Sequence, residues 1–465
     1  MKLKAGIFLA IFALAAGFGL AAGAALSAEA DEPHFAGELL SGSREAAGFT
    51  LTLDAAFEEH LVLFETYDAS SGEGSSRCAR RSPEPLRLHE DSAEPALEYP
   101  SLFLTLNYYW DFGEPLPGEL PAALADEVVA LIAEGGGERR LGLSDFTERA
   151  PLCFQTRNIA REPDSAAAYG LASGGERFAL PAPEDAELEL SLHVNTKSYS
   201  LFVSVEGPAV DAVSNSVYTG GGLYLLLADA AFFTGGDYEP VSPELLPGDA
   251  FGIYRVPCGA GEDGFTVDLG AAENIFPLAR CSAAALLAGP EGGLLLASLE
   301  EGALYLTAID PDTGRAAQRL KLAEGLEAPG QGRRLFTAWD CGFSDGLFRA
   351  QLGERYFFAR CEGGRFEPLP EVGAASLPDA APAGPVSAAL ASAAYEDGLL
   401  YTLEHIYRPK GSPEGGFAYA HRLAAFDGEG NCLYCEQLSH PLTDYFNRPP
   451  SGGAGKFRLT GPERS

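Results

Sequence analysis

A strand, a tight turn and a second strand recur along this chain, and this recurrence constrains the fold more than any other feature. The clearest copy is 302–322, GALYLTAIDPDTGRAAQRLKL. Apolar side chains occupy most positions on both faces of its first half, as expected for a strand covered on two sides. The DPDTG stretch at 310–314 then reverses the chain, because proline fixes φ, aspartate and threonine bond nearby backbone, and glycine accepts a positive φ. Weaker copies of this unit predict a series of antiparallel sheets.

The spacing of the turn glycines predicts how these sheets are organised. Gly259, Gly314, Gly363 and Gly428 follow one another at intervals of 49 to 65 residues. A period of about 40 to 60 residues with about four short strands is typical of propeller blades. The sequence therefore predicts an all-β fold, a β-propeller of about seven four-stranded blades, with six and eight as alternatives. Two β-sandwich domains are the competing architecture, but they do not explain a glycine turn after each fourth strand.

The predicted blades cover most of the chain, and its last strand is expected to return to the first blade. The blades are 48–90, 100–145, 152–207, 209–270, 281–324, 333–370 and 385–440. The strand 456–460, KFRLT, is expected to pair beside the first blade and close the ring, which removes an exposed sheet edge. Leu120–Glu134 has the composition of an amphipathic helix ended by Gly135. We interpret 126–134 as a strand instead, because the later units continue as strand, glycine turn and strand.

The first 30 residues predict export. Lys2 and Lys4 precede an uncharged run at 5–26, and AEA at 28–30 offers a small-x-small cleavage site. The run of 22 residues is also long enough to span a bilayer, so a retained anchor is the alternative. We therefore divide the chain into a signal peptide or N-terminal membrane anchor at 1–30 and a β-propeller domain at 37–465. The predicted location is the cell envelope or the outside of the cell.

The charge of the chain limits its partners. The formal net charge is −34, and the only basic concentration after the leader is small, at Arg77, Arg80 and Arg81. Such a surface repels phosphate backbones and anionic lipid headgroups, so nucleic-acid binding is excluded and membrane contact is expected only through an N-terminal anchor. The expected ligand is a protein or a glycan, and no cofactor is predicted.

The cysteines are weak evidence for disulfide bonds or for a metal site. The chain has eight, at Cys78, Cys153, Cys258, Cys281, Cys341, Cys361, Cys432 and Cys435. Eight in so long a chain is not the density of a disulfide scaffold, and Cys341 with Cys361 is the first pair to test for a bond, while the connectivity stays open. Cys432 and Cys435 have the CxxC spacing of a redox dithiol or half a zinc site. Because i and i+3 point to opposite faces of a strand and no second CxxC or histidine pair completes a tetrahedral set, no metal site is predicted.

One motif resembles a known family of propellers. The segment 308–315, AIDPDTGR, resembles the blade motif of quinoprotein-like propellers, in which A-x-D-x-x-T-G-K leads to a tryptophan three residues after the basic position. Arg315 stands for the lysine and Gln318 for the tryptophan, and 425–430 is a shortened echo. The pairs Trp110-Asp111 and Trp339-Asp340 resemble the WD dipeptide of WD40-like repeats. The resemblance implies the fold, and the missing tryptophan argues against a quinone enzyme.

Two groups of residues are candidates for ligand binding. Tyr108, Tyr109, Trp110 and Asp111 precede a proline-rich loop and would form a stacking surface for a sugar or a peptide. His405, Tyr407, Arg408 and His421 lie on adjacent predicted strands and would supply a base and an anion clamp to a polysaccharide lyase. Packing in the core is the competing interpretation for the first group, and a chance cluster without a shared role is the competing interpretation for the second. No residue is assigned a catalytic role.

Two further motifs are interpreted as turns. GFSDG at 342–346 matches G-x-S-x-G, but it links two predicted strands and lacks the helix that a nucleophile elbow requires. The acidic positions of 310–312 and 427–431 resemble the start of a calcium loop without its distal glutamate. These observations favour an exported, non-catalytic β-propeller that binds a protein or glycan. The alternative is a secreted carbohydrate-active enzyme, a lyase or hydrolase, of propeller architecture.

Overall fold

The structure is a computed structural model in which the chain forms two compact units. Unit 1 comprises residues 1–88 and 373–465, and unit 2 comprises residues 89–372. The described residues are 35–57, 61–80, 94–101, 108–109, 124–146, 148–160, 177–181, 186–195, 200–206, 212–229, 250–262, 264–327, 339–373, 376–377, 387–409, 417–439 and 456–460. Within these ranges, no helix has the length and apolar character needed to cross a membrane. The leader at 1–30 lies outside them.

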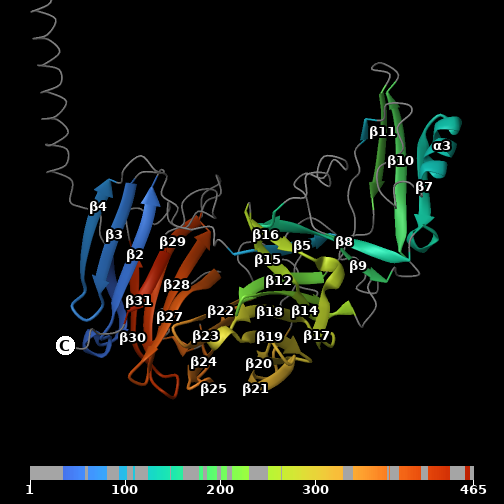
Figure 1. Ribbon diagram of the computed structural model, residues 1–465. Helices are drawn as coiled ribbons and strands as arrows, with labels where there is room; N and C mark the ends of the chain where they lie inside the picture. The colour runs from blue at the N-terminus through green and yellow to red at the C-terminus, as the bar shows by residue number, and fades with distance from the viewer. Residues whose placement is uncertain are drawn as a thin grey trace, which may run out of the picture. The chain divides into compact units, whose positions relative to one another are not determined.

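Unit 1 consists of two antiparallel sheets (Figure 1). The first has the order β1-β30-β29-β28-β27, and the second has the order β31-β2-β3-β4. Their strands are β1 (Ala36–Gly42), β2 (Thr50–Phe57), β3 (Leu61–Asp68), β4 (Glu73–Arg80), β27 (Ser387–Glu396), β28 (Leu399–Pro409), β29 (Phe417–Phe426), β30 (Cys432–Ser439) and β31 (Lys456–Thr460). Both sheets therefore combine strands from the two ends of the chain.

The C-terminal strand pairs where the sequence predicts. β31 runs antiparallel to β2, with Leu459 opposite Leu51 and Thr460 opposite Thr50. One core cluster of unit 1 combines side chains of both sheets: Phe35, Phe49, Leu51, Tyr67, Tyr401, Leu403, Leu423, Tyr434, Leu438 and Leu459. The pairing thus covers the β2 edge of the sheet, which would otherwise expose unpaired backbone groups.

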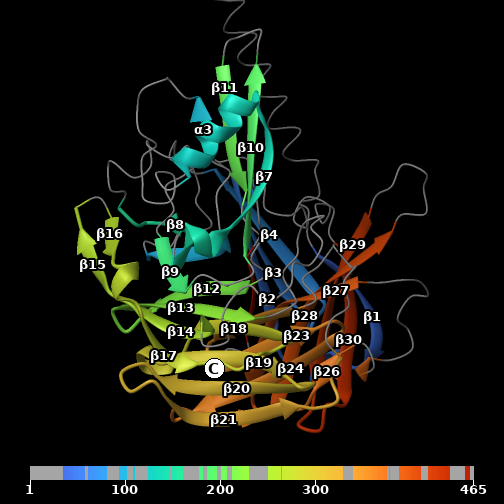
Figure 2. The same cartoon turned by 90° about the vertical axis from the view of Figure 1, so that its right-hand side faces the viewer.

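Unit 2 contains three four-stranded meanders, which confirm the predicted sheets at 281–324 and 333–370. The predicted blade 209–270 is confirmed only in part, because the fourth strand of its meander lies beyond residue 270 and residues 264–267 belong to a separate hairpin. Their orders are β12-β13-β14-β17, β18-β19-β20-β21 and β22-β23-β24-β25, and Figure 2 shows the second with its strands side by side. The strands are β12 (Ala212–Thr219), β13 (Gly222–Asp229), β14 (Gly252–Val256), β17 (Glu273–Pro277), β18 (Ala283–Ala288), β19 (Leu294–Glu300), β20 (Ala303–Asp310), β21 (Arg315–Ala323), β22 (Trp339–Ser344), β23 (Leu347–Leu352), β24 (Arg355–Glu362) and β25 (Arg365–Pro368). A hairpin, β15 (Cys258–Gly261) with β16 (Gly264–Val267), interrupts the first meander, and β26 (Val372–Gly373) pairs with β24.

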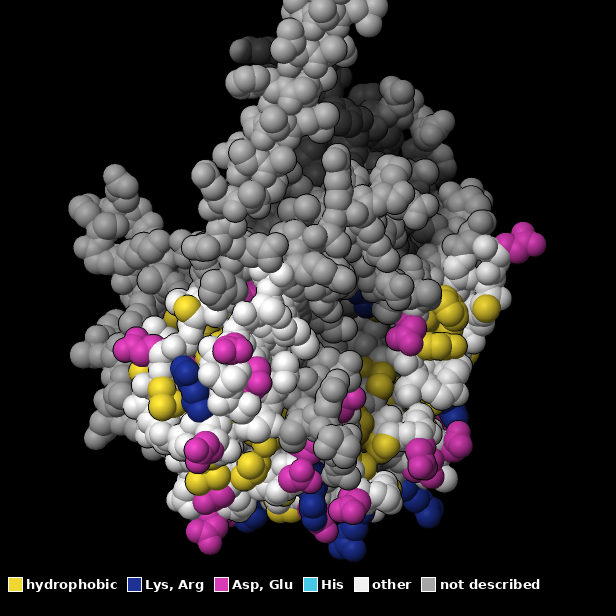
Figure 3. Space-filling view, turned by 90° about the vertical axis from the view of Figure 1, so that its left-hand side faces the viewer, with side chains coloured by type: hydrophobic (Ala, Val, Ile, Leu, Met, Phe, Trp, Pro, Cys, Tyr) yellow, Lys and Arg dark blue, Asp and Glu magenta, His cyan; other side chains and the backbone are white. Residues whose placement is uncertain are grey.

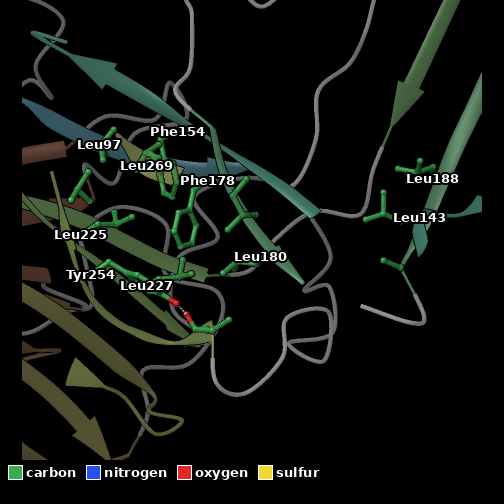
Figure 4. Close-up of a cluster of buried hydrophobic side chains, with 14 of the residues drawn as sticks. Leu97, Leu143, Phe154, Phe178, Leu180, Leu188, Leu225, Leu227, Tyr254 and Leu269 are labelled. Atoms are coloured by element: carbon green, nitrogen blue, oxygen red, sulfur yellow. Dashed lines mark hydrogen bonds between the residues drawn. The ribbon is translucent and has the colours of Figure 1, made fainter. Parts of the chain in front are cut away.

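The predicted blades 100–145 and 152–207 are wrong, because their strands exchange partners. One sheet has the order β6-β11-β10-β7 and draws on both segments, and the other has the order β5-β8-β9, in which β5 begins before residue 100. The strands are β5 (Ala96–Ser101), β6 (Tyr108–Tyr109), β7 (Gly137–Gly142), β8 (Arg149–Arg157), β9 (Arg177–Pro181), β10 (Glu187–Asn195) and β11 (Ser200–Glu206). Phe154 and Phe178 pack with residues of the β12 meander in a shared core (Figure 4).

The strand predicted at 126–134 is also wrong: these residues belong to helix α3 (Ala125–Glu134). Val128 and Leu131, three residues apart, are its buried positions, as the 3.6-residue period requires. Asp126 and Glu127 in the first turn interact favourably with the helix dipole, and Gly135 ends the helix in the left-handed conformation with a φ of 87°. Local propensity therefore outweighs the analogy with the later units.

Neighbouring sheets of unit 2 contact each other through their first strands. β12 packs beside β5 and β18, and β18 packs beside β22. Two amide side chains strengthen the junctions between sheets. Asn215 of β12 donates to the carbonyl of Leu286 (2.6 Å) and accepts from its N–H (3.0 Å). Gln318, which replaces the tryptophan of the blade motif, makes the same two bonds to Phe366 of β25 (2.7 and 2.9 Å).

The acidic turns use their carboxylates internally. Asp310 accepts from the N–H of Asp312 (2.9 Å) and from the hydroxyl of Thr313 (2.9 Å), and Gly314 adopts a φ of 63°. Asp427 accepts in the same way from Glu429 and Asn431. The G-x-S-x-G motif is a hairpin between β22 and β23. These results confirm the predicted turns.

Candidate functional site

Two histidines predicted to act together face each other on neighbouring strands of unit 1. The register places His405 of β28 opposite His421 of β29. Their Nδ1 atoms are 3.0 Å apart and their ring centroids 4.9 Å. His421 is completely buried, and the edge of Phe35 packs against it at a centroid distance of 5.8 Å. The structure thus brings both histidines within hydrogen-bond reach, as a shared role requires.

Burial keeps His405 neutral at physiological pH. A hydrogen bond between the two Nδ1 atoms needs one ring that carries a proton there and one that does not. Two imidazolium rings would direct two N–H groups at each other. Burial lowers the pKa of His405 to about 4, because the charged ring loses its hydration. Since His421 has no exposed surface, only His405 can contact a substrate.

We expect the protein to lose stability as the pH falls from about 6.5 to about 4, the interval between the ordinary pKa and the folded-state pKa of His405. In this interval the unfolded chain binds a proton that the folded protein does not. The free energy of unfolding therefore falls by up to about 1.4 kcal/mol per pH unit. Urea unfolding at several pH values should show a shallower fall for His405→Gln. The matched control His193→Gln, at an exposed position on β10, should keep the wild-type slope, and an unchanged slope in His405→Gln would contradict the assignment.

A buried carboxylate lies between the two sheets of unit 1. Glu436 of β30 is 0% exposed. Its carboxylate accepts hydrogen bonds from the hydroxyls of Tyr67 (2.8 Å) and Tyr434 and pairs with Arg44, which belongs to the short 3-10 helix η1 (Arg44–Ala46). Burial, and then hydrogen bonding to Glu436, raises the pKa of both tyrosines, so they stay protonated as donors. This carboxylate has three donors and no exposed surface.

A second buried ion pair lies on the same sheet. Arg422 of β29 is opposite Glu404 of β28, and its Nε donates to Glu404. The two side chains are only 7% and 3% exposed. Glu404 and Arg422 each lie one residue from the histidine pair, so they belong to the opposite face of the sheet. Sequence reasoning missed both buried pairs, since a charged residue on a strand usually predicts a solvent-facing position.

The other predicted binding residues are only partly described. Tyr407 and Arg408 lie on β28 opposite Tyr419 and Ala418, and the structure gives their backbone alone. Tyr108 and Tyr109 form β6, an edge strand that pairs with β11. Trp110 and Asp111 lie outside the described residues. The two predicted groups belong to different units, the first to unit 2 and the second to unit 1.

A β-bulge brings the two CxxC cysteines to one face of β30. Cys432 lies opposite Phe426 and Cys435 opposite Ala424, and the ladder skips Leu433. Phe426 and Ala424 are two positions apart on β29, so the cysteines opposite them share a face. The prediction of opposite faces, which assumed unbroken alternation, is wrong.

Cys341 and Cys361, the first pair to test for a disulfide, are not bonded to each other. Cys341 pairs in register with Ala350 of β23 and Cys361 with Phe366 of β25, so the two cysteines lie on strands that are not neighbours. Both are free thiols.

Comparisons with known proteins add little. No protein-family model and no curated protein match the chain. A mutant of the GH43 protein BlXynB from Bacillus licheniformis matches at 12% identity and a TM-score of 0.23, over 54% of this chain and about half (52%) of that one. The periplasmic gluconolactonase PpgL from Pseudomonas aeruginosa matches at 12% identity and a TM-score of 0.25, over 89% of this chain and 99% of that one. Likeness of this degree carries no argument about function.

Proposed function

We propose that the protein is an exported, non-catalytic β-propeller that binds a protein or glycan ligand through loops at one mouth of the ring. The fold part of the proposal is supported by consecutive four-stranded meanders whose first strands are adjacent, and by the return of β31 to β2. These are features of blades arranged around an axis. Export is supported by the uncharged run at 5–26.

One observation carries the non-catalytic part of the proposal: the buried carboxylates and histidines described in unit 1 bind other groups of the protein, and Glu65, for example, accepts from the N–H of Phe35. Glu436 is fully buried and interacts with three donors, and Glu404 is paired with Arg422. His421 is fully buried and contacts His405. A general acid or base must reach a proton on the substrate. Figure 3 shows acidic and basic side chains dispersed over the described part of one face, which is typical of a solvated surface.

The second candidate is a carbohydrate-active enzyme, and the 3.0 Å approach of the two histidines favours it. His405 is partly exposed and neutral, so it can accept a proton, and His421 would fix its tautomer. Incubation with polysaccharides and lactones separates the two candidates. New reducing ends, unsaturated sugars or opened lactones that disappear in His405→Gln would establish the enzyme.

For the binding module, we expect Tyr109→Ala and Trp110→Ala to weaken ligand binding about 5- to 150-fold each, because loss of an aromatic contact costs about 1–3 kcal/mol. The measurement is a glycan and peptide array probed with the purified protein, followed by titration of the ligand it identifies. Tyr305→Ala is the matched control, since this strand tyrosine is occupied by Arg319, whose guanidinium lies 4.1 Å from the ring centre. Equal affinity of all three variants would contradict the assigned surface.

A further inference from the structure

The bulge at Leu433 places two free thiols side by side. Cys432 and Cys435 are both free, and they share the face of β30 that also carries Gln437. Neighbouring positions on one face of a strand are roughly 6.5–7 Å apart between Cα atoms, and disulfides span about 4.4–6.8 Å. A small tightening of the bulge is therefore enough for a bond between the two sulfurs.

The two thiols differ in access. Cys432 is partly exposed at the start of β30, whereas Cys435 is 1% exposed. A soluble reagent can reach only the first. In dithiol exchange, the accessible cysteine attacks and the buried cysteine resolves the intermediate, so this asymmetry matches the order of the chemistry.

The surroundings of the pair favour a thiolate on Cys432. Hydrogen bonding with the Cys435 thiol, a bond to the backbone of Tyr434 and the charge of Arg422 lower the pKa of Cys432 against the opposing effect of burial. The Cys432 thiol also donates to the carbonyl oxygen of Tyr434 (3.2 Å), a bond that favours the protonated form and is lost when the thiolate forms. The same thiol–thiol interaction, together with burial, raises the pKa of Cys435. The pair therefore has one thiol ready to attack and one that retains its proton.

We infer that Cys432 and Cys435 are a redox-active dithiol that reduces soluble disulfides and itself becomes a reversible disulfide on the surface of unit 1. The inference is independent of the proposed binding function. It follows from the shared face and the unequal access of the two thiols.

The reaction takes place in two exchanges. The Cys432 thiolate attacks one sulfur of a small disulfide, and the S–S bond of that disulfide breaks. The first small thiolate leaves and takes up a proton from the solvent. Cys435 then loses its proton and attacks the Cys432 sulfur, and the second small thiolate leaves and is protonated. Two protein thiols are oxidised by two electrons, and one disulfide is reduced to two thiols.

The test exposes the full-length reduced protein to glutathione disulfide, blocks the remaining thiols with N-ethylmaleimide and maps the peptides by mass spectrometry. We expect a bond between Cys432 and Cys435 while Cys258, a partly exposed cysteine on β15, stays free and alkylated. Cys435→Ser should instead accumulate a mixed disulfide with glutathione on Cys432, about tenfold more than the wild type. Cys435→Ala serves the same purpose if the serine variant does not fold.

Three results would overturn the inference. They are oxidation of Cys432 no faster than that of Cys258, a bond from either cysteine to a third one, and the absence of the mixed disulfide in the folded Cys435 variant. Return of the free thiols on addition of dithiothreitol is the expected sign that the bond is labile.

Discussion

Glu436→Gln is expected to lower the free energy of unfolding by about 2–3 kcal/mol, because it removes the charged acceptor of a fully buried site, whereas Arg44, whose side chain is 33% exposed, keeps part of its hydration. The amide that replaces the carboxylate also presents two donors where Tyr67 and Tyr434 already donate. The loss is therefore larger than that of one neutral hydrogen bond, which contributes about 1 kcal/mol. Urea unfolding at neutral pH measures it.

The matched control is Glu324→Gln. Glu324 forms an exposed ion pair with Lys321, and exposed pairs contribute about 0–1 kcal/mol. The control should therefore stay close to the wild type. A Glu436→Gln protein within about 1 kcal/mol of the wild type would show that the network does not stabilise the packing of the two sheets.

Local signals explain what could be predicted from the sequence. The turn at 310–314 carries its own chemistry, so β20 and β21 follow from residues close to one another in the chain. The later meanders are predictable for the same reason, since each consists of hairpins with short connections. The pairing of 456–460 with the first strands was also predictable, because an unpaired edge is unfavourable wherever it occurs.

The errors arise where partners are far apart or where the period breaks. β7 pairs with β10 and β5 with β8 across long connections, and strand composition does not encode such a choice. β4 begins with a polar sequence, EGSS, and is a strand because β3 supplies its partner along its whole length. The bulge at Leu433 adds one residue to the ladder, and a single insertion changes the face of every side chain before it.

The sequence predicted that His405 and His421 belong to one site, but it did not predict the buried charged groups of the same unit. The register needed to bring His405 and His421 together follows from two strands joined in a hairpin. The burial of Glu436, Glu404 and Arg422 does not follow from the hairpin, since it depends on which other parts of the chain cover each face of the sheet. The result is a set of charges that sequence patterns would place in solvent and that folding places inside.

Arg422→Met is expected to lower the free energy of unfolding by about 3–5 kcal/mol, because Glu404, whose side chain is 3% exposed, then loses its ion-pair partner inside the sheet. The surface variant Arg360→Met is the control. Arg360 pairs with Glu367 at 2.6 Å, but both side chains are about half exposed (40% and 52%), so its loss should stay within about 1 kcal/mol.

The double variant Glu404→Leu with Arg422→Met tests whether the Glu404–Arg422 ion pair stabilises the fold. Replacing a buried ion pair by apolar side chains is often neutral, so we expect it to recover most of the loss, to within about 1–2 kcal/mol of the wild type. The role of the pair would then be electrostatic, since Arg422 lowers the pKa of Cys432 and its removal should slow the attack of that thiol on glutathione disulfide. A double variant as unstable as Arg422→Met alone would show instead that shape and hydrogen bonding at these two positions hold the sheet together.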